Sequence, residues 1–358
     1  MAQNQTARKR DASRVIKRIL MVLCALIAAL AIVVFALWGG ELSTLKTLSR
    51  VEDDVNLFTM EYKADYALDE FLKAGASTDA ELVDFIVRQM LKGIPLNFDL
   101  PNLGCSTFAA QLTDGTPIFG RNFDMYDSPA LFVTTRPKDG YASISMVNLA
   151  YIGYNSESLP TSLTKSIMTL AAPYAPLDGV NEKGLAVGVL QIKTTPTNQQ
   201  TDKVDITTTS AIRLLLDRAA TVEEAVELLS QYDMHASAGS CYHFHIADAK
   251  GGSVIVEYID DEMSVVQGDA ATNFLLTPGE YDFGTGEDRY AVLRETLDAN
   301  GGVFESEEQA MELLKAVSQP VSEGKKSSTQ WFCVYNQQDA GVEIAMNMDY
   351  EKVYTFGL

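Results

Sequence analysis

The fold of this chain is decided by Leu103-Gly104-Cys105-Ser106-Thr107-Phe108, which is followed by Asp114-Gly115 and then by Gly120-Arg121-Asn122-Phe123-Asp124. Two apolar runs, 106–112 and 117–121, flank Thr113-Asp114-Gly115-Thr116. Asp-Gly between such runs is the strongest short-range signal for a hairpin with a two-residue turn. If Thr113 pairs with Thr116, then Cys105 pairs with Asp124, and a carboxylate lies beside a thiol at the end of the ribbon.

This register leaves the position of Arg121 open. Side chains alternate between the two faces of a strand, so Arg121 is expected on the face opposite to Asp124. For both to serve one site, the ribbon must end or bulge between them.

The amino-terminal part is expected to be a membrane anchor. Residues 1–18 are rich in arginine and lysine, and residues 19–38 contain no charged side chain. Twenty apolar residues in a helix cover about 30 Å, the thickness of a bilayer core. We therefore expect a basic cytoplasmic tail at 1–18, a transmembrane signal-anchor helix at 19–38 and the remainder outside the cell membrane. The alternative is a secreted protein, cut at a signal peptide near Ala29-Leu30-Ala31.

Residues 39–104 are expected to form a helical stalk or pro-segment. Apolar residues recur at helical spacing, and Thr78 with Glu81 forms a capping box. The segment ends in Gly93-Ile94-Pro95 and Asp99-Leu100-Pro101-Asn102, a turn-rich composition suited to an exposed, cleavable joint before Cys105.

Charge and cysteine content exclude some classes of protein. The chain of 358 residues has a formal net charge of −20, and from Cys105 onward 35 acidic residues outweigh 16 basic ones. That part is expected to repel nucleic acid and anionic membrane surfaces. Of the four cysteines, Cys24 falls in the apolar run, which leaves an odd number and no closed disulfide framework. A Cys241–Cys333 bridge remains an alternative to two buried thiols.

Segregated strands and helices predict an α+β fold in which two antiparallel sheets pack face to face under helices. The expected strands are 185–192, 242–247, 253–258, 263–267, 274–277, 330–335, 342–346 and 352–356. The expected helices are 210–220, 221–232, 288–298 and 306–316.

Taken in order, several pieces resemble the choloylglycine hydrolase family of linear amide C–N hydrolases, which includes bile salt hydrolases, penicillin V acylases and, more distantly, acid ceramidase-like proteins. These pieces are the Cys105 hairpin, Asp178-Gly179-Val180-Asn181-Glu182-Lys183-Gly184-Leu185, Thr272-Asn273, Arg289 and Thr329-Gln330-Trp331. The resemblance implies a four-layer αββα sandwich at 105–358 and the N-terminal-nucleophile mechanism.

That mechanism needs no histidine and no cofactor. Once the Gly104–Cys105 bond is cut, the α-amine of Cys105 has a pKa of roughly 7.7–8.0, close to that of a thiol at about 8.5, so it can act as the base. The thiolate attacks an amide carbon, and water then releases the acid from a thioester. Acid ceramidase-like relatives cut this bond themselves, and the same self-cleavage is the hypothesis for this chain.

The resemblance also implies a role for each polar residue of the site. Asp124 would hold the α-amine and Arg121 would steady the nucleophile. Asn181 and Asn273 would donate to the oxyanion, and Arg289 would complete the cluster. Four aromatic residues would line a pocket for an apolar acyl group, or else belong to the core: Tyr126, Phe132, Tyr151 and Tyr154.

The expected substrate is an N-acyl amide of the conjugated bile acid, penicillin V or N-acyl amine type. Two alternatives stay open: an uncut surface protein with a binding or structural role, and an acyltransferase that uses the same thioester. Oligomerisation is possible. His243-x-His245 puts two imidazoles on one strand face, but a third ligand at a familiar spacing is absent, so no metal site is predicted.

Overall fold

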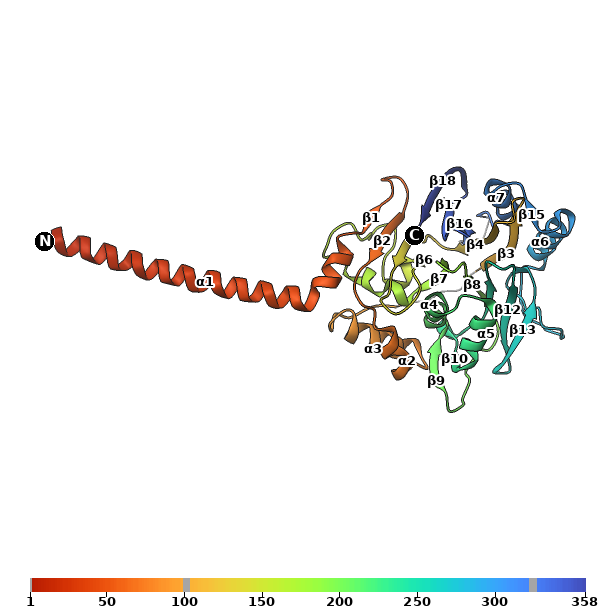
Figure 1. The fold of residues 1–358 in the computed structure, drawn as a ribbon, viewed down its shortest axis with the longest axis horizontal. Helices are drawn as coiled ribbons and strands as arrows, with labels where there is room; N and C mark the ends of the chain where they lie inside the picture. Colours follow the sequence, from red (N-terminus) through yellow and green to blue (C-terminus); the bar gives the residue numbers. More distant parts are fainter. Residues whose placement is uncertain (1, 99–103, 322–326) are drawn as a thin grey trace.

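Two β-sheets pack face to face, with helices against their outer faces, in the computed structural model (Figure 1). It describes residues 2–98, 104–321 and 327–358. The nine-stranded sheet contains, in spatial order, β1 (Ser49–Arg50), β2 (Leu57–Tyr62), β5 (Ala130–Thr135), β6 (Ser143–Asn148), β7 (Pro176–Asn181), β8 (Ala186–Ile192), β11 (Cys241–Ala247), β12 (Ser253–Ile259) and β13 (Glu262–Gln267).

The second sheet carries the Cys105 hairpin. Its strands are β14 (Ala270–Ala271), β3 (Gly104–Leu112), β4 (Pro117–Met125), β16 (Ser328–Asn336), β17 (Gly341–Met346) and β18 (Asp349–Gly357), with β15 (Val303–Phe304) pairing parallel to β3. A separate parallel pair is formed by β9 (Val204–Thr207) and β10 (Tyr232–His235).

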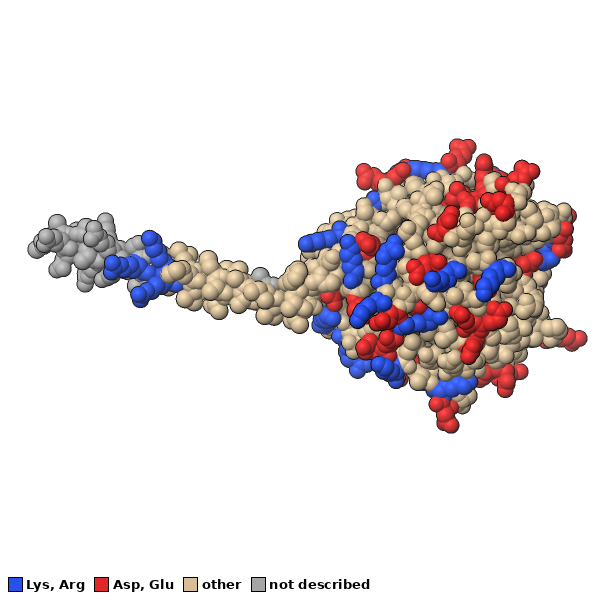
Figure 2. All heavy atoms as spheres, in the orientation of Figure 1, with Lys and Arg blue, Asp and Glu red and all other residues tan. Residues whose placement is uncertain are grey.

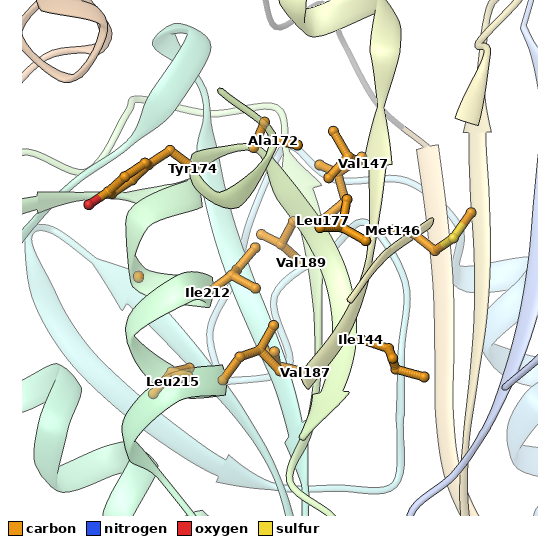
Figure 3. Close-up of a cluster of buried hydrophobic side chains, with 14 of the residues drawn as sticks. Ile144, Met146, Val147, Ala172, Tyr174, Leu177, Val187, Val189, Ile212 and Leu215 are labelled. Atoms are coloured by element: carbon orange, nitrogen blue, oxygen red, sulfur yellow. The ribbon is translucent and has the colours of Figure 1, made fainter. Parts of the chain in front are cut away.

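Helices cover both sheets. The α-helices are α1 (Ala2–Leu45), α2 (Leu68–Ala74), α3 (Asp79–Gln89), α4 (Thr208–Arg218), α5 (Val222–Ser230), α6 (Glu287–Asn300) and α7 (Glu307–Ala316). The 3-10 helices are η1 (Leu149–Ile152), η2 (Ile167–Tyr174) and η3 (Ser237–Gly239). Helices α4 and α5 pack on the nine-stranded sheet, and α6 and α7 on the other. In Figure 3, Ile212 and Leu215 of α4 lie against Val187 and Val189 of β8.

The predicted strands and helices after residue 184 are confirmed, except for 274–277. That stretch is irregular because a buried carboxylate captures its backbone. Oxygens of Glu257 accept from the N–H groups of Leu276 at 2.7 Å and Thr277 at 2.8 Å, so neither is available to a strand ladder.

The predicted register of the Cys105 hairpin is wrong by one residue. Cys105 pairs with Phe123, and Gly104 pairs with Asp124. The turn holds three residues instead of two: Leu112 N–H donates to Thr116 O at 2.8 Å, and Gly115 closes the loop at φ 89°. Three-residue hairpin loops commonly end with a glycine in this left-handed conformation. A one-residue shift moves every side chain of one strand to the other face.

The segment upstream of Cys105 is part of the folded core, which differs from the expected helical stalk. Strand β2 pairs parallel with β5 along six residues, from Leu57 opposite Ala130 to Tyr62 opposite Thr135. The run Leu-Phe-Thr-Met-Glu-Tyr is rich in strand-forming residues, and four of its six side chains are buried. The Thr78 cap at the start of α3 is confirmed, while the expected joint at 99–102 lies outside the described residues.

The expected transmembrane helix is wrong, and so is the cell-membrane location inferred from it. A span requires an unbroken apolar helix of about 20 residues. Within the residues that the structure describes, no helix has both the length and the apolar character to cross a membrane. The apolar run instead forms part of α1, which reaches from Ala2 to Leu45 and packs at its carboxyl end against β2 and η2.

Acidic and basic side chains are interspersed on the surface. On the face shown in Figure 2, acidic side chains are spread over the domain with basic ones between them. All four cysteines are free, and Cys241 and Cys333 are both buried. The bridge alternative is therefore wrong.

Substituting Phe71 is expected to destabilise the whole domain. Its ring is fully buried and packs edge-on against Phe85 at 5.2 Å and against Tyr174 at 5.3 Å between centroids. Phe71→Ala should lower the free energy of unfolding by about 3–5 kcal/mol. Urea unfolding followed by Trp331 fluorescence, in a Trp38→Phe background, measures it. Exposed Lys73 of the same helix is the control, and Lys73→Ala should stay within about 0.5 kcal/mol. If Phe71→Ala leaves the midpoint of the Trp331 unfolding transition unchanged, the upstream segment folds separately from the rest of the domain.

Candidate active site around Cys105

Cys105 lies fully buried at the start of β3, and polar groups hold its backbone on both sides. Its N–H donates to Asn273 Oδ1 at 2.8 Å, and its carbonyl oxygen accepts from Arg289 Nη1 at 2.5 Å. Arg289 Nη2 also donates to Asn273 Oδ1 at 2.9 Å, so one network links all three residues.

Strand pairing brings Asn273 to this position. Ala270 and Ala271 of β14 pair with Phe108 and Thr107 of β3, so the chain continues from β14 toward Cys105. Arg289 arrives from the first turn of α6. The predicted neighbours Asn273 and Arg289 are therefore both in contact with Cys105.

Arg121 lies on the same face as Cys105, which answers the open question about its position. The observed register pairs Arg121 with Thr107, two residues along β3 from Cys105. Its Nε donates to Asp178 Oδ2 at 3.3 Å, and both side chains are fully buried. Tyr335 O–H donates to the other oxygen of Asp178. The Nη1 and Nη2 groups of Arg121 have no hydrogen-bond acceptor among the described residues.

Asp124 lies beside Gly104, one residue before the thiol. Its carboxylate accepts from Thr329 Oγ1 and from Gln319 Nε2, each at 2.5 Å, and Arg289 Nη1 is 3.6 Å away. A Cβ added at Gly104 would stand 2.9 Å from Gln319 Nε2 and 3.2 Å from Asp124 Oδ2. Glycine is thus the residue that leaves room for this carboxylate next to the backbone.

The thiol of Cys105 is held in its neutral form. Burial is the main cause that raises its pKa to about 11, and the charge of Asp124 acts in the same direction. The charges of Arg121 and Arg289 lower this pKa, but by less than burial raises it. A buried group disfavours its charged form, and a nearby cation favours a thiolate. The site thus combines a desolvated thiol with two cations positioned to stabilise negative charge on it.

A cavity of about 700 Å³ opens beside this cluster. Gly104, Asp124, Asn273 and Arg289 line it, together with Gln191 at the end of β8. The remaining described lining residues are mostly polar. The peptide bond before Cys105 therefore lies at the wall of an open, polar cavity.

Asn181 is not brought to this cavity. It is the last residue of β7, at the start of the turn into β8, and its Nδ2 donates to the carbonyl oxygens of Leu216 at 3.0 Å and Ala219 at 2.7 Å. Its Oδ1 accepts from the N–H groups of the same turn. The end of this turn, at Leu185, is six residues from Gln191, which is roughly 20 Å at about 3.3 Å per strand residue.

Of the four aromatic residues proposed for the acyl pocket, Tyr126 lines the cavity. Phe132 stacks on Phe356, and the Tyr154 hydroxyl donates to the carbonyl of Lys165. Tyr151 is fully buried near the thiol: its pKa is raised by burial and then by Tyr242 and Cys105, and its hydroxyl has no partner among the described residues.

Three residues of the site were not singled out from the sequence. Asp178 had a signal, because a carboxylate in a buried strand needs a cationic partner, and here that partner is Arg121. Thr329 was quoted only as a marker, yet it donates to Asp124. Gln191, whose carbonyl accepts from Asn273 Nδ2 at 2.9 Å, had no signal in an otherwise apolar strand.

Labelling of Cys105 should reveal the raised pKa. In the peptide that still joins Gly104 to Cys105, alkylation by iodoacetamide should be slow at pH 7 and rise about tenfold per pH unit up to pH 9, because the thiolate is the reacting form. Arg121→Gln should slow it further, since the charge of Arg121 lowers this pKa. Peptide mass spectrometry measures both, with the exposed thiol of Cys24 as the internal reference. Labelling of Cys105 as fast as that of Cys24 at pH 7 would contradict its burial.

Comparisons with known proteins point to one family. The model of the linear amide C-N hydrolases, choloylglycine hydrolase family, matches residues 105–282. A penicillin V acylase from Pectobacterium atrosepticum is 34% identical over 102 residues, a match that covers 25% of this chain and about a quarter (26%) of that protein.

Solved structures share the fold. A mutant conjugated bile acid hydrolase from Clostridium perfringens superposes with a TM-score of 0.52 at 17% identity, covering 71% of this chain and 92% of that one. Penicillin V acylase from Agrobacterium tumefaciens gives 0.50 at 18% identity, covering 71% and 86%. The resemblance of the sequence to the choloylglycine hydrolase family of linear amide C-N hydrolases is confirmed over residues 105–282.

Proposed function

We propose that the domain beginning at Cys105 is a cysteine amidohydrolase that cleaves a linear amide C–N bond of an N-acyl substrate, after cutting its own Gly104–Cys105 bond. The observation that carries this proposal is the convergence of Arg121, Asn273 and Arg289 on Cys105, next to Gly104 at the wall of a cavity. The match to the family model supports the reaction type.

The first step is self-cleavage. Cys105 Sγ attacks the carbonyl carbon of Gly104, the S–C bond forms, the C–N bond breaks, and the nitrogen of Cys105 takes up the thiol proton. Water then hydrolyses the thioester, which leaves a carboxylate on Gly104 and returns the thiol. Asn273 and Arg289 support this step, because they fix the nitrogen and the carbonyl oxygen of Cys105.

The second step acts on an external amide. The new α-amine, with a reference pKa of roughly 7.7–8.0, takes the thiol proton and later activates water. Arg121 stabilises the thiolate, and Asp178 holds Arg121 in place. Asp124 lies next to the position of the new amine and orients it.

The substrate is proposed to be an N-acyl amide with a polar group close to the scissile bond. The described lining of the cavity is mostly polar and includes Lys193 and Asp288, which suits such a group better than a wholly apolar one. Penicillin V and conjugated bile acids, named for the relatives, are the first candidates.

Self-cleavage is tested on the purified chain. Wild-type protein should yield a fragment whose first residue is Cys105, read by amino-terminal sequencing, and Cys105→Ala should stay full length because it lacks the nucleophile. The matched control is Cys241→Ala, which removes another buried thiol and should be cut like wild type. Intact wild-type chain under all conditions would rule out the proposed mechanism and favour an uncut binding or structural protein.

Amide hydrolysis is tested with a substrate panel: a conjugated bile acid, penicillin V, an N-acyl amino acid and an N-acylethanolamine. Cut wild-type protein should release the amine from at least one of them, and Cys105→Ala from none. Added hydroxylamine should divert part of the acyl group to a hydroxamate, because a thioester reacts with amines. Product that forms only when an amine is added would identify an acyltransferase. If none of the amides gives a product, the proposed amidohydrolase activity is wrong.

A further inference from the structure

The two histidines of β11 are fully buried and have different surroundings. His243 Nδ1 lies 3.1 Å from Glu257 Oε1, and its Nε2 lies 2.7 Å from the carbonyl oxygen of Thr272. Thr272 is the residue before Asn273, which holds the backbone nitrogen of Cys105. The mechanism above makes no use of His243.

Both partners of His243 are hydrogen-bond acceptors. A backbone carbonyl cannot donate, and neither can an ionised carboxylate. Glu257 is taken as ionised, because one oxygen accepts from the N–H of Leu276 at 2.7 Å and the other from the N–H of Thr277 at 2.8 Å, and hydrogen bonds of this kind favour the carboxylate. Both ring nitrogens of His243 must therefore carry a proton, so the ring is a buried imidazolium paired with a carboxylate.

This ion pair holds the loop on both sides of Asn273. On one side, His243 donates to the carbonyl of Thr272. On the other side, Glu257 accepts from Leu276 and Thr277. The side chain of Asn273 then spans from the carbonyl of Gln191 to the N–H of Cys105.

We propose that His243 is a positioning residue: as an imidazolium paired with Glu257, it holds the Thr272–Asn273 peptide and thereby places the Asn273 side chain on the nitrogen of Cys105. Its effect on turnover rests on the proposed function. Its protonation state and its effect on the loop do not.

His245 provides a matched control on the same strand face. Its Nδ1 lies 2.8 Å from Thr107 Oγ1, and its Nε2 lies 2.9 Å from Ser253 Oγ, whose hydroxyl donates to the carbonyl of Gly268. Ser253 therefore accepts from Nε2–H, and Thr107 donates to Nδ1. Burial and the charge of His243 lower the pKa of His245 to about 3, which agrees with a neutral ring.

The first experiment measures protonation in the uncut Cys105→Ala chain. The sequence contains three histidines, so single substitutions assign every imidazole signal in ¹⁵N-histidine-labelled protein. At pH 7, His243 should show two protonated nitrogens and His245 one. A single protonated nitrogen on His243 would overturn the proposal, and this readout needs no activity.

The second experiment asks whether His243 acts through Asn273. His243→Asn should lower the rate of self-cleavage and the kcat for the amide by about 10- to 100-fold with KM changed less than threefold, whereas His245→Asn should stay within threefold of wild type in both. In an Asn273→Ala background, His243→Asn should cause no further loss, because residues that act as one unit are not additive.

The outcomes separate the two proposals. Multiplicative losses in the double variant, or equal losses for His243→Asn and His245→Asn, would overturn the positioning role while the amidohydrolase stands. If wild-type protein cleaves nothing, the amidohydrolase fails, and labelling of Cys105 replaces kcat as the readout. His243→Asn should then change the labelling rate by at least threefold and His245→Asn should not, and equal rates would overturn the positioning role.

Discussion

The pairing of β3 with β4 fixes the surroundings of Cys105. The three-residue turn closed by Gly115 sets Cys105 opposite Phe123 and Gly104 opposite Asp124. Arg121 then falls on the face of the thiol, and Asp124 falls beside the peptide bond that precedes it. The alternative two-residue turn would exchange these positions, because a slip of one residue turns a strand over. The conformation of Gly115 thus determines that Arg121 lies on the face of the Cys105 sulfur and that Asp124 lies beside the backbone of Gly104.

Two buried ion pairs hold different parts of the site. Asp178 fixes Arg121 against β3, and Glu257 with His243 fixes the loop that carries Asn273. Burying a single charge without its partner would cost free energy of folding, so each member of a pair stabilises the burial of the other. The Nη1 and Nη2 groups of Arg121 make no hydrogen bond among the described residues, and the charge of Arg121 acts on the one thiol that the proposal assigns to chemistry.

Much of this arrangement could be predicted from local sequence. Alternating and helical patterns located the four α-helices and the longer strands after residue 184, though not the short strands β9, β10, β14 and β15, and the Asp-Gly signal located the hairpin. The register could not be predicted, because the choice between two and three turn residues depends on the backbone conformation of Gly115. The 274–277 strand was wrong because Glu257, distant in sequence, takes its backbone donors. Asn181 was assigned by motif, yet its amide is fully used by its own turn and by α4.

Cutting the Gly104–Cys105 bond would change the site without releasing the upstream segment. Strand β2 stays bonded to β5, and the Tyr66 hydroxyl still donates to Asp217 Oδ2 at 2.6 Å inside the core. What changes is the nitrogen of Cys105. In the uncut chain this nitrogen has one N–H, which donates to Asn273 Oδ1. After the cut, as an ammonium group, it has two further N–H donors. The carboxylate of Asp124, packed against Gly104, is positioned to receive them, so the same residues suit the nitrogen before and after the cut.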